Sequence, residues 1–125
     1  MKKAIVTDQA PAAVGPYSQA VEAGGWIYLS GQLPLRPGAG TFPEGIAAQT
    51  RQALTNLREV LRQAGLDMDD IVKTTVMLAD MADFAAMNEV YAEFFHAPYP
   101  ARCAFAVKSV PKGALVEIDA VAVRP

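Results

Sequence analysis

The chain has 125 residues, the size of one ordinary domain, and 52% of them are hydrophobic against 19% charged. That composition excludes an intrinsically disordered chain, because this much apolar surface can be buried in a core. The 11 basic and 13 acidic residues leave a net charge of −2, without the basic surplus that nucleic-acid binding normally requires. We therefore expect one folded domain, no nucleic-acid partner, and a subunit interface that covers part of the apolar surplus.

A single cysteine, Cys103, cannot build a disulfide framework, which favours a reducing compartment. The opening MKKAIVTDQAPAAVG lacks the apolar run of a signal peptide. No window reaches the roughly 18 consecutive apolar residues of a transmembrane helix. The expectation is a cytoplasmic protein with no membrane partner.

The first elements in the chain are predicted to be strands. Residues 26–30, rich in aromatic and β-branched types, indicate a strand, and residues 17–23 are a weaker candidate. Gly24 and Gly25 between them favour a hairpin turn. Prolines and glycines at 34–40 then predict a loop.

Helical spacing is clearest after that loop. Thr41 and Glu44 resemble a capping box, Pro43 suits a first turn, and Gly65 supplies a stop. The apolar positions that share one face of the predicted helix are Ile46, Thr50, Ala53, Leu54, Leu57, Val60, Leu61 and Ala64.

The second half predicts a strand, a helix and two further strands. Residues 71–79 favour a strand with Val72, Thr74, Val76 and Leu78 on one side. A second helix should begin at Asp80 to Asp83 and end at Pro98 and Pro100, and its apolar stripe comprises Phe84, Met87, Tyr91, Phe94 and Phe95.

Strands at 102–108 and 115–123 follow, and we expect them to pair as a hairpin across the turn near Pro111. The order ββ(β)αβαββ predicts an α+β fold, with two helices on one face of a single mixed sheet. The other face would remain bare, and we expect subunits to assemble through it.

Absent motifs narrow the chemistry. The chain has no phosphate-binding glycine loop and no G-x-S-x-G nucleophile motif. One histidine, His96, and one cysteine cannot assemble a zinc deaminase site. We therefore expect no metal and no cofactor, with carboxylate, arginine, tyrosine and backbone groups carrying any reaction.

Arg102 and Glu117 are the main candidates. Arg102 begins a strand and shares a face with the small Ala104 and Ala106, which leaves room for a carboxylate ligand held by paired hydrogen bonds; otherwise it is a surface arginine. Glu117 and Asp119 lie in an apolar strand, where desolvation would raise a carboxyl pKa toward the range useful for proton transfer. Otherwise they form the polar face of an edge strand.

The expected hairpin also gives a distance. It would offset Arg102 and Glu117 by about 13 Å along the strand direction. A ligand that touches both groups is then easier to place in a site completed by another subunit.

Other candidates lie at strand ends and in the second helix. Tyr17 with the polar segment 15–19, and Ser30 with Gly31, suit either ligand approach or ordinary turns. Asn88 interrupts the apolar stripe, and we expect it to be buried, in a structural network or as a ligand group. We expect His96 at a helix end, and Cys103 in the core on the face of Phe105.

At these residues the sequence resembles the Rid family of reactive intermediate deaminases, also called the YjgF-like or endoribonuclease L-PSP family. The resemblance covers essentially the whole chain, as one Rid-type domain over residues 1–125. Its motifs are Gly15-Pro16-Tyr17-Ser18-Gln19, Ser30-Gly31-Gln32, Gln49-Thr50, Pro100-Ala101-Arg102, Phe105, Val110 and Val116-Glu117-Ile118.

The resemblance implies a chorismate-mutase-like fold and a homotrimer with clefts between subunits. It also implies cofactor-independent hydrolysis of 2-imino acids and their enamine tautomers, such as 2-iminopropanoate or 2-iminobutanoate, to 2-keto acids and ammonia. By the same resemblance, Arg102 holds the substrate carboxylate, Glu117 handles water and protons, and four residues line the cleft: Tyr17, Ser30, Gly31 and Asn88.

One departure and two alternatives remain. Some members carry cysteine where this chain has Ala104, so no thiol role is assigned to the neighbouring Cys103. The first alternative function is a non-catalytic trimer that binds small carboxylates. The second is an endoribonuclease or translation inhibitor, which the net charge of −2 disfavours.

Overall fold

The computed structural model describes residues 1–125 and contains six strands and two α-helices. Their order along the chain confirms the predicted sequence of elements and the α+β class. The elements are β1 Lys3–Ile5, β2 Ala20–Ala23, β3 Trp26–Gln32, α1 Ile46–Gln63, β4 Ile71–Leu78, α2 Phe84–Ala92, β5 Ala101–Ala106 and β6 Val116–Val123.

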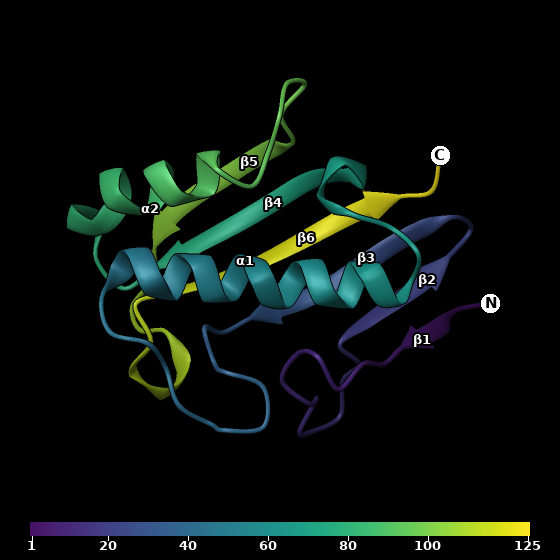
Figure 1. Cartoon of the computed structure of the whole chain (residues 1–125), viewed down its shortest axis with the longest axis horizontal. Helices are drawn as coiled ribbons and strands as arrows, with labels where there is room; N and C mark the ends of the chain where they lie inside the picture. Colours follow the sequence, from purple (N-terminus) through teal and green to yellow (C-terminus); the bar gives the residue numbers. More distant parts are fainter.

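One mixed sheet carries both helices on the same face (Figure 1). Its strand order is β1-β2-β3-β6-β4-β5, and only β4 and β5 run parallel. A parallel pair needs a crossover connection, and α2 supplies it between β4 and β5. The crossover places α2 over β4 and β5, where its side chains contact Thr74 and Arg102, while α1 lies across β6 and β3.

The expected hairpin of the last two strands is wrong. β6 inserts between β3 and β4, whereas β5 stays at the sheet edge. The burial pattern explains this arrangement, because β6 presents four fully apolar, buried side chains to the helices and therefore belongs at the centre: Val116, Ile118, Ala120 and Ala122. β5 is partly or fully exposed along its length and suits an edge.

The first hairpin is confirmed, although β2 begins three residues later than expected, at Ala20. Ala23 pairs with Trp26 across a two-residue turn. Gly24 and Gly25 have φ angles of 58° and 83°, the left-handed values that a type I′ turn requires at both central positions.

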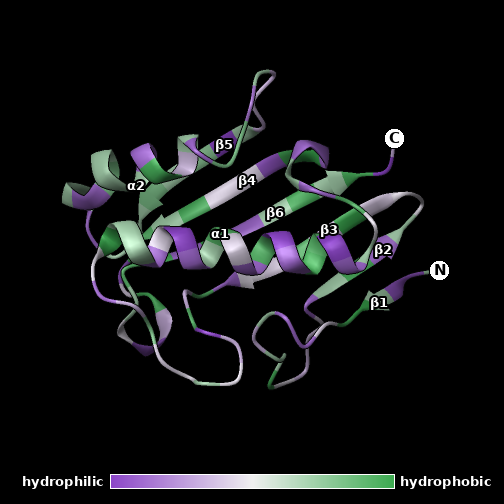
Figure 2. Ribbon diagram, viewed as in Figure 1, coloured by the Kyte–Doolittle hydropathy of each residue, from purple (hydrophilic) through white to green (hydrophobic).

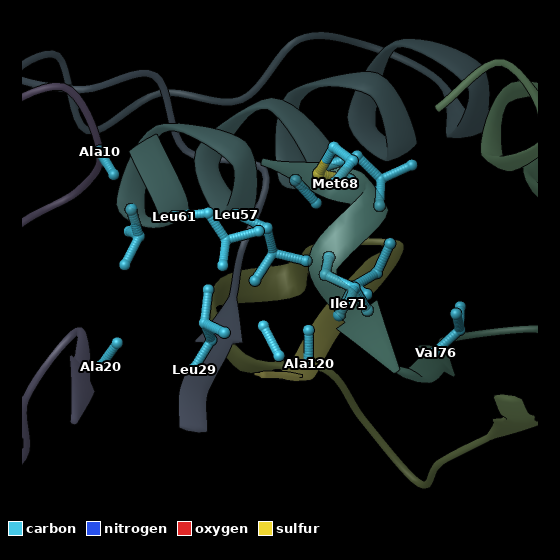
Figure 3. Close-up of a cluster of buried hydrophobic side chains, with 14 of the residues drawn as sticks. Ala10, Ala20, Leu29, Leu57, Leu61, Met68, Ile71, Val76 and Ala120 are labelled. Atoms are coloured by element: carbon cyan, nitrogen blue, oxygen red, sulfur yellow. The ribbon is translucent and has the colours of Figure 1, made fainter. Parts of the chain in front are cut away.

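Helix α1 buries the predicted face against the sheet. The predicted positions from Thr50 to Leu61 are all buried, while Ile46 and Ala64 at the two ends pack against the core less completely. Figure 3 shows Leu57 and Leu61 pointing from this helix toward Leu29 and Ala120 in the sheet. Burial of each such leucine stabilises the fold by roughly 1.5–3 kcal/mol.

The sequence predicted the C-terminal end of α1 correctly but not its N-terminal end. At the C-terminal end Gly65 has φ 79° and Leu66 N–H donates to the Leu61 carbonyl, which confirms the glycine stop. At the N-terminal end the capping box is wrong. The helix begins after Gly45, and the Thr41 hydroxyl accepts a hydrogen bond from Arg36 instead.

Predictions for β4 and for the end of α2 also need correction. A register shift between Ile71 and Lys73 turns Ile71 into the core and leaves Val72 39% exposed, so Val72 does not share the side of Thr74. Helix α2 ends at Ala92, well before Pro98, although Phe95 beyond its end is still buried. His96 therefore caps no helix and lies exposed, 3.4 Å from Asp69.

The second face of the sheet is not covered by any helix. It exposes Trp26 and Tyr28 of β3 and Phe105 of β5. Cys103 is exposed on the same face, so its expected place in the core is wrong. In Figure 2 apolar and polar residues alternate along the strands, as expected for a sheet whose two faces differ in surroundings. No helix in the structure has the length and apolar character needed to cross a membrane.

Candidate functional site

A cleft of about 590 Å³ opens where β3 ends and β6 begins. It brings together four of the residues predicted from the sequence: Tyr17, Ser30, Gly31 and Glu117. Apolar side chains of the N-terminal segment and of the loop after β3 form much of the remaining wall, with Val14, Leu33 and Leu35 among them, and Lys112 also lines it. The cleft therefore combines one carboxylate, hydroxyl groups and an apolar wall.

Gly31 allows the Glu117 carboxylate to lie directly against the backbone of β3. A Cβ atom at position 31 would stand 2.8 Å from Glu117 Oε2 and 3.0 Å from Cδ. The pairing of β3 with β6 shifts register between Leu29 and Gln32, so a bulge lies at this point. The requirement for glycine here is one of space, since Gly31 does not adopt a positive φ.

The surroundings of Glu117 favour the neutral form of its carboxyl group. Burial raises the pKa of its carboxyl group above the ordinary value, and the negative charge of Asp119 raises that pKa further. No side-chain donor within the protomer satisfies this carboxylate. A group of this kind can take a proton from water and return it, which is the behaviour of a general base and acid.

Ser30 and Gln19 hold the N-terminal wall of the cleft in place. The Ser30 hydroxyl donates to the Ser18 carbonyl at 2.6 Å, and Ser30 N–H donates to the Gln19 carbonyl. The buried Gln19 side chain bonds to both backbone groups of Thr7 and to the Pro11 carbonyl. Tyr17, in the segment so anchored, is 55% exposed.

Arg102 lies elsewhere, beneath helix α2. Its Nη1 donates to Asn88 Oδ1 at 2.6 Å, and its guanidinium carbon stands 4.7 Å from the centre of the Tyr91 ring and 5.5 Å from that of Phe84. Asn88 is exposed, which contradicts its expected burial, because its helical position faces the sheet edge rather than the core. The structure thus joins Arg102 to Asn88 but not to the cleft of Glu117.

Strand register places Arg102 and Glu117 on opposite faces of the sheet. Arg102 is level with Thr74, which faces α2, and Glu117 is level with Met77. Thr74 and Met77 are three positions apart in β4, so their side chains point to opposite faces. The two groups are also separated by about 10 Å along the strands and about 10 Å across them. One ligand cannot touch both within a single protomer.

No group of three His, Cys, Asp or Glu side chains lies close enough together to hold a metal ion. The candidate residues form two separate groups, the Glu117 cleft and the Arg102 cluster.

Some members of these two groups were not predicted. Lys112 lines the Glu117 cleft and is the one non-glycine residue with positive φ, at 61°. Tyr91 and Phe84 were predicted only as core. Pro111 and Gly113 indicate a turn at Lys112, but no sequence signal places Lys112 in the cleft. Nor does any signal separate an aromatic residue beneath arginine from an ordinary core residue.

Three comparisons with known proteins agree. The family model described as endoribonuclease L-PSP matches residues 7–124. A mouse protein named 2-iminobutanoate/2-iminopropanoate deaminase is 50% identical over 99% of this chain and 93% of its own length. The crystal structure of RidA from a Psychrobacter species has a TM-score of 0.94 and 44% identity, covering 98% of this chain and 99% of that one. Escherichia coli TdcF, crystallised with bound serine, has a TM-score of 0.94 and 43% identity, covering 98% of this chain and 99% of that one.

Proposed function

The chain belongs to the Rid family, the family of the endoribonuclease L-PSP model, and on that premise we propose that it hydrolyses 2-imino acids and their enamine tautomers to 2-keto acids and ammonia. The names of relatives at about half identity support a deaminase. The bound serine of TdcF supports a site that accepts a small amino-acid-like carboxylate.

The observation that carries the proposal is the separation of Arg102 from Glu117 onto opposite sheet faces. A functional site that uses both needs the Arg102 cluster of one protomer and the Glu117 cleft of another. The uncovered sheet face, with Trp26, Tyr28 and Phe105 exposed, is a surface through which protomers can associate. We infer a homotrimer with three such sites, in which each protomer contributes both halves to different sites.

Each residue then has a distinct role. Arg102, with Asn88 beside it, binds the substrate carboxylate and orients the imine. Glu117 accepts a proton from water as the oxygen bonds to the carbon of the protonated imine, and the C=N π pair moves to nitrogen to give a neutral carbinolamine. The C–N bond of the resulting carbinolamine then breaks, nitrogen leaves with the bonding pair after it gains a proton from Glu117, and loss of the hydroxyl proton gives the keto acid. Tyr17, Ser30 and Gly31 line the pocket in which this occurs.

A direct assay tests the activity. An amino-acid oxidase generates the imine in situ, semicarbazide competes for it, and the release of 2-keto acid is followed with and without the protein. We expect wild type to accelerate the release, and Arg102→Ala and Glu117→Gln to abolish most of the acceleration. No acceleration by wild type with any imine would refute the deaminase. Stabilisation by keto acids without turnover would indicate a carboxylate-binding module, and RNA cleavage lost in Arg102→Ala would indicate a nuclease.

Mixed oligomers test the shared site. We expect the Arg102→Ala and Glu117→Ala variants each to be inactive. When the two are mixed in equal amounts, unfolded and refolded together, about one-quarter of all sites should contain both native residues if these come from different protomers. Each variant refolded alone is the control. No regained activity, in oligomers shown by mass to be mixed, would contradict the shared site.

A further inference from the structure

Two aromatic rings of α2 and one amide surround the guanidinium of Arg102. The Tyr91 ring centre is 4.7 Å and the Phe84 ring centre 5.5 Å from the guanidinium carbon, both within the roughly 6 Å range of cation–π attraction. Asn88 Oδ1 accepts from Nη1 at the guanidinium edge. The other four N–H donors of Arg102 have no partner in the protomer.

Tyr91 is held in place more firmly than a ring in van der Waals contact alone. It is 6% exposed, and its hydroxyl is 2.7 Å from Thr74 Oγ1, itself fully buried. Thr74 is also the register partner of Arg102 in β4. Phe95 also packs against this ring, with 4.5 Å between the two ring centroids. The strand that positions the Arg102 backbone therefore also positions the ring beneath its side chain.

We propose that Tyr91 is a positioning residue for Arg102, whose ring holds the guanidinium in one orientation before a substrate carboxylate arrives. The proposal rests on the proposed function of Arg102. An arginine side chain has several free torsions, and a bound carboxylate must freeze them. Tyr91, Phe84 and Asn88 fix the torsions of Arg102 in advance. The loss of side-chain entropy therefore occurs during folding and does not weaken substrate binding.

This role differs from that of an ordinary core tyrosine. If the ring only filled the core, its loss would lower the stability of the fold and leave substrate affinity unchanged. If the ring orients Arg102, its loss raises KM and weakens binding of the keto-acid product, while kcat changes little because Glu117 is untouched. The ring face carries this effect, so phenylalanine at position 91 should preserve most of it.

The experiment compares Tyr91→Leu, Tyr91→Phe and Val90→Ala. Val90 is a buried residue of the same helix and serves as the control for lost stability. Imine hydrolysis gives KM and kcat, calorimetry gives the Kd of 2-oxobutanoate, and thermal unfolding gives Tm. For Tyr91→Leu we expect both KM and Kd to rise about 5- to 30-fold. Tyr91→Phe should stay within about threefold of wild type, and Val90→Ala should lower Tm without raising KM.

Several outcomes overturn the proposal. Unchanged KM and Kd in Tyr91→Leu would do so, as would an equal rise in Val90→Ala. If Tyr91→Leu fails to fold, Phe84→Leu removes the more distant and less buried ring, and an unchanged Kd there would count equally against an aromatic clamp. Failure of the proposed function looks different. Wild type would then show no turnover, and Arg102→Ala would bind 2-oxobutanoate as wild type does.

Discussion

Replacement of Gly31 by alanine tests whether the Glu117 carboxylate must lie against the backbone of β3. The new Cβ would stand 2.8 Å from Oε2, and ordinary contact begins at 3.4 Å, so the carboxylate must retreat by about 0.6 Å. The carboxylate is the far end of a flexible side chain, so it can move without unfolding the strand. The damage should therefore fall on catalysis and not on stability.

The expected magnitudes differ by readout. Misplacement of a catalytic group by this amount should lower kcat by about 10- to 100-fold. Stability should change by less than about 1 kcal/mol, because alanine also reduces the entropy of the unfolded chain by an amount worth about 0.4–1 kcal/mol. The assays are keto-acid release from an imine and thermal unfolding of the same samples.

The Glu117→Ala variant serves as a second background, which isolates the contact between residue 31 and the Glu117 carboxylate. In Glu117→Ala the obstructing carboxylate is gone, so adding Gly31→Ala should raise Tm, whereas in the wild-type background it should not. Full kcat in Gly31→Ala would refute the reasoning. So would the same change of Tm in both backgrounds.

Three further predictions concern the cleft. Asp119→Asn removes a negative charge near Glu117, so the pKa of Glu117 falls. The acid limb of the pH profile of kcat/KM should then move to lower pH, and an unmoved limb would show that another group titrates. Because the folded state raises the pKa of Glu117 above 4.5, ionisation destabilises the fold as pH rises past that value. Glu117→Gln should therefore raise Tm at about pH 7, with a gain that fades at about pH 4, and a pH-independent gain would contradict this. Asn56→Ala leaves the carbonyls of Leu33 and Leu35 without their side-chain donor and should lower the free energy of unfolding by about 2–4 kcal/mol, measured by denaturant unfolding. Gln63→Ala, at an exposed position of the same helix, should be nearly neutral and is its control.

The order of elements could be predicted because its signals are local. The two-residue glycine turn specifies the first hairpin, and the face from Thr50 to Leu61 together with Gly65 specifies α1 and its end. The capping box at Thr41 failed because the same residue types also suit a loop, and Gly45 decides where the helix begins. Such alternatives differ by amounts that tertiary contacts easily outweigh.

The order of the strands in the sheet could not be predicted from the sequence. Two successive strands with a short turn usually pair, and that rule put β5 beside β6. The structure places β6 between β3 and β4, because its four buried apolar residues need helices above them and β5 offers no such face. Strand position depends on contacts between residues far apart in the chain, which no local pattern encodes.

For the site, the sequence alone determined the candidate residue types: an arginine at a strand start, a glutamate in an apolar strand, and glycine beside a strand end. Only the tertiary structure showed that Gly31 leaves space for the Glu117 carboxylate. It also showed that Asn88 and Tyr91 contact Arg102. Finally, it placed Arg102 and Glu117 on opposite faces of the sheet. The reason is geometric. The alternation of side chains between the two faces of one strand is a local property. The relative position of residues in β5 and β6 depends instead on the register that each strand shares with β4.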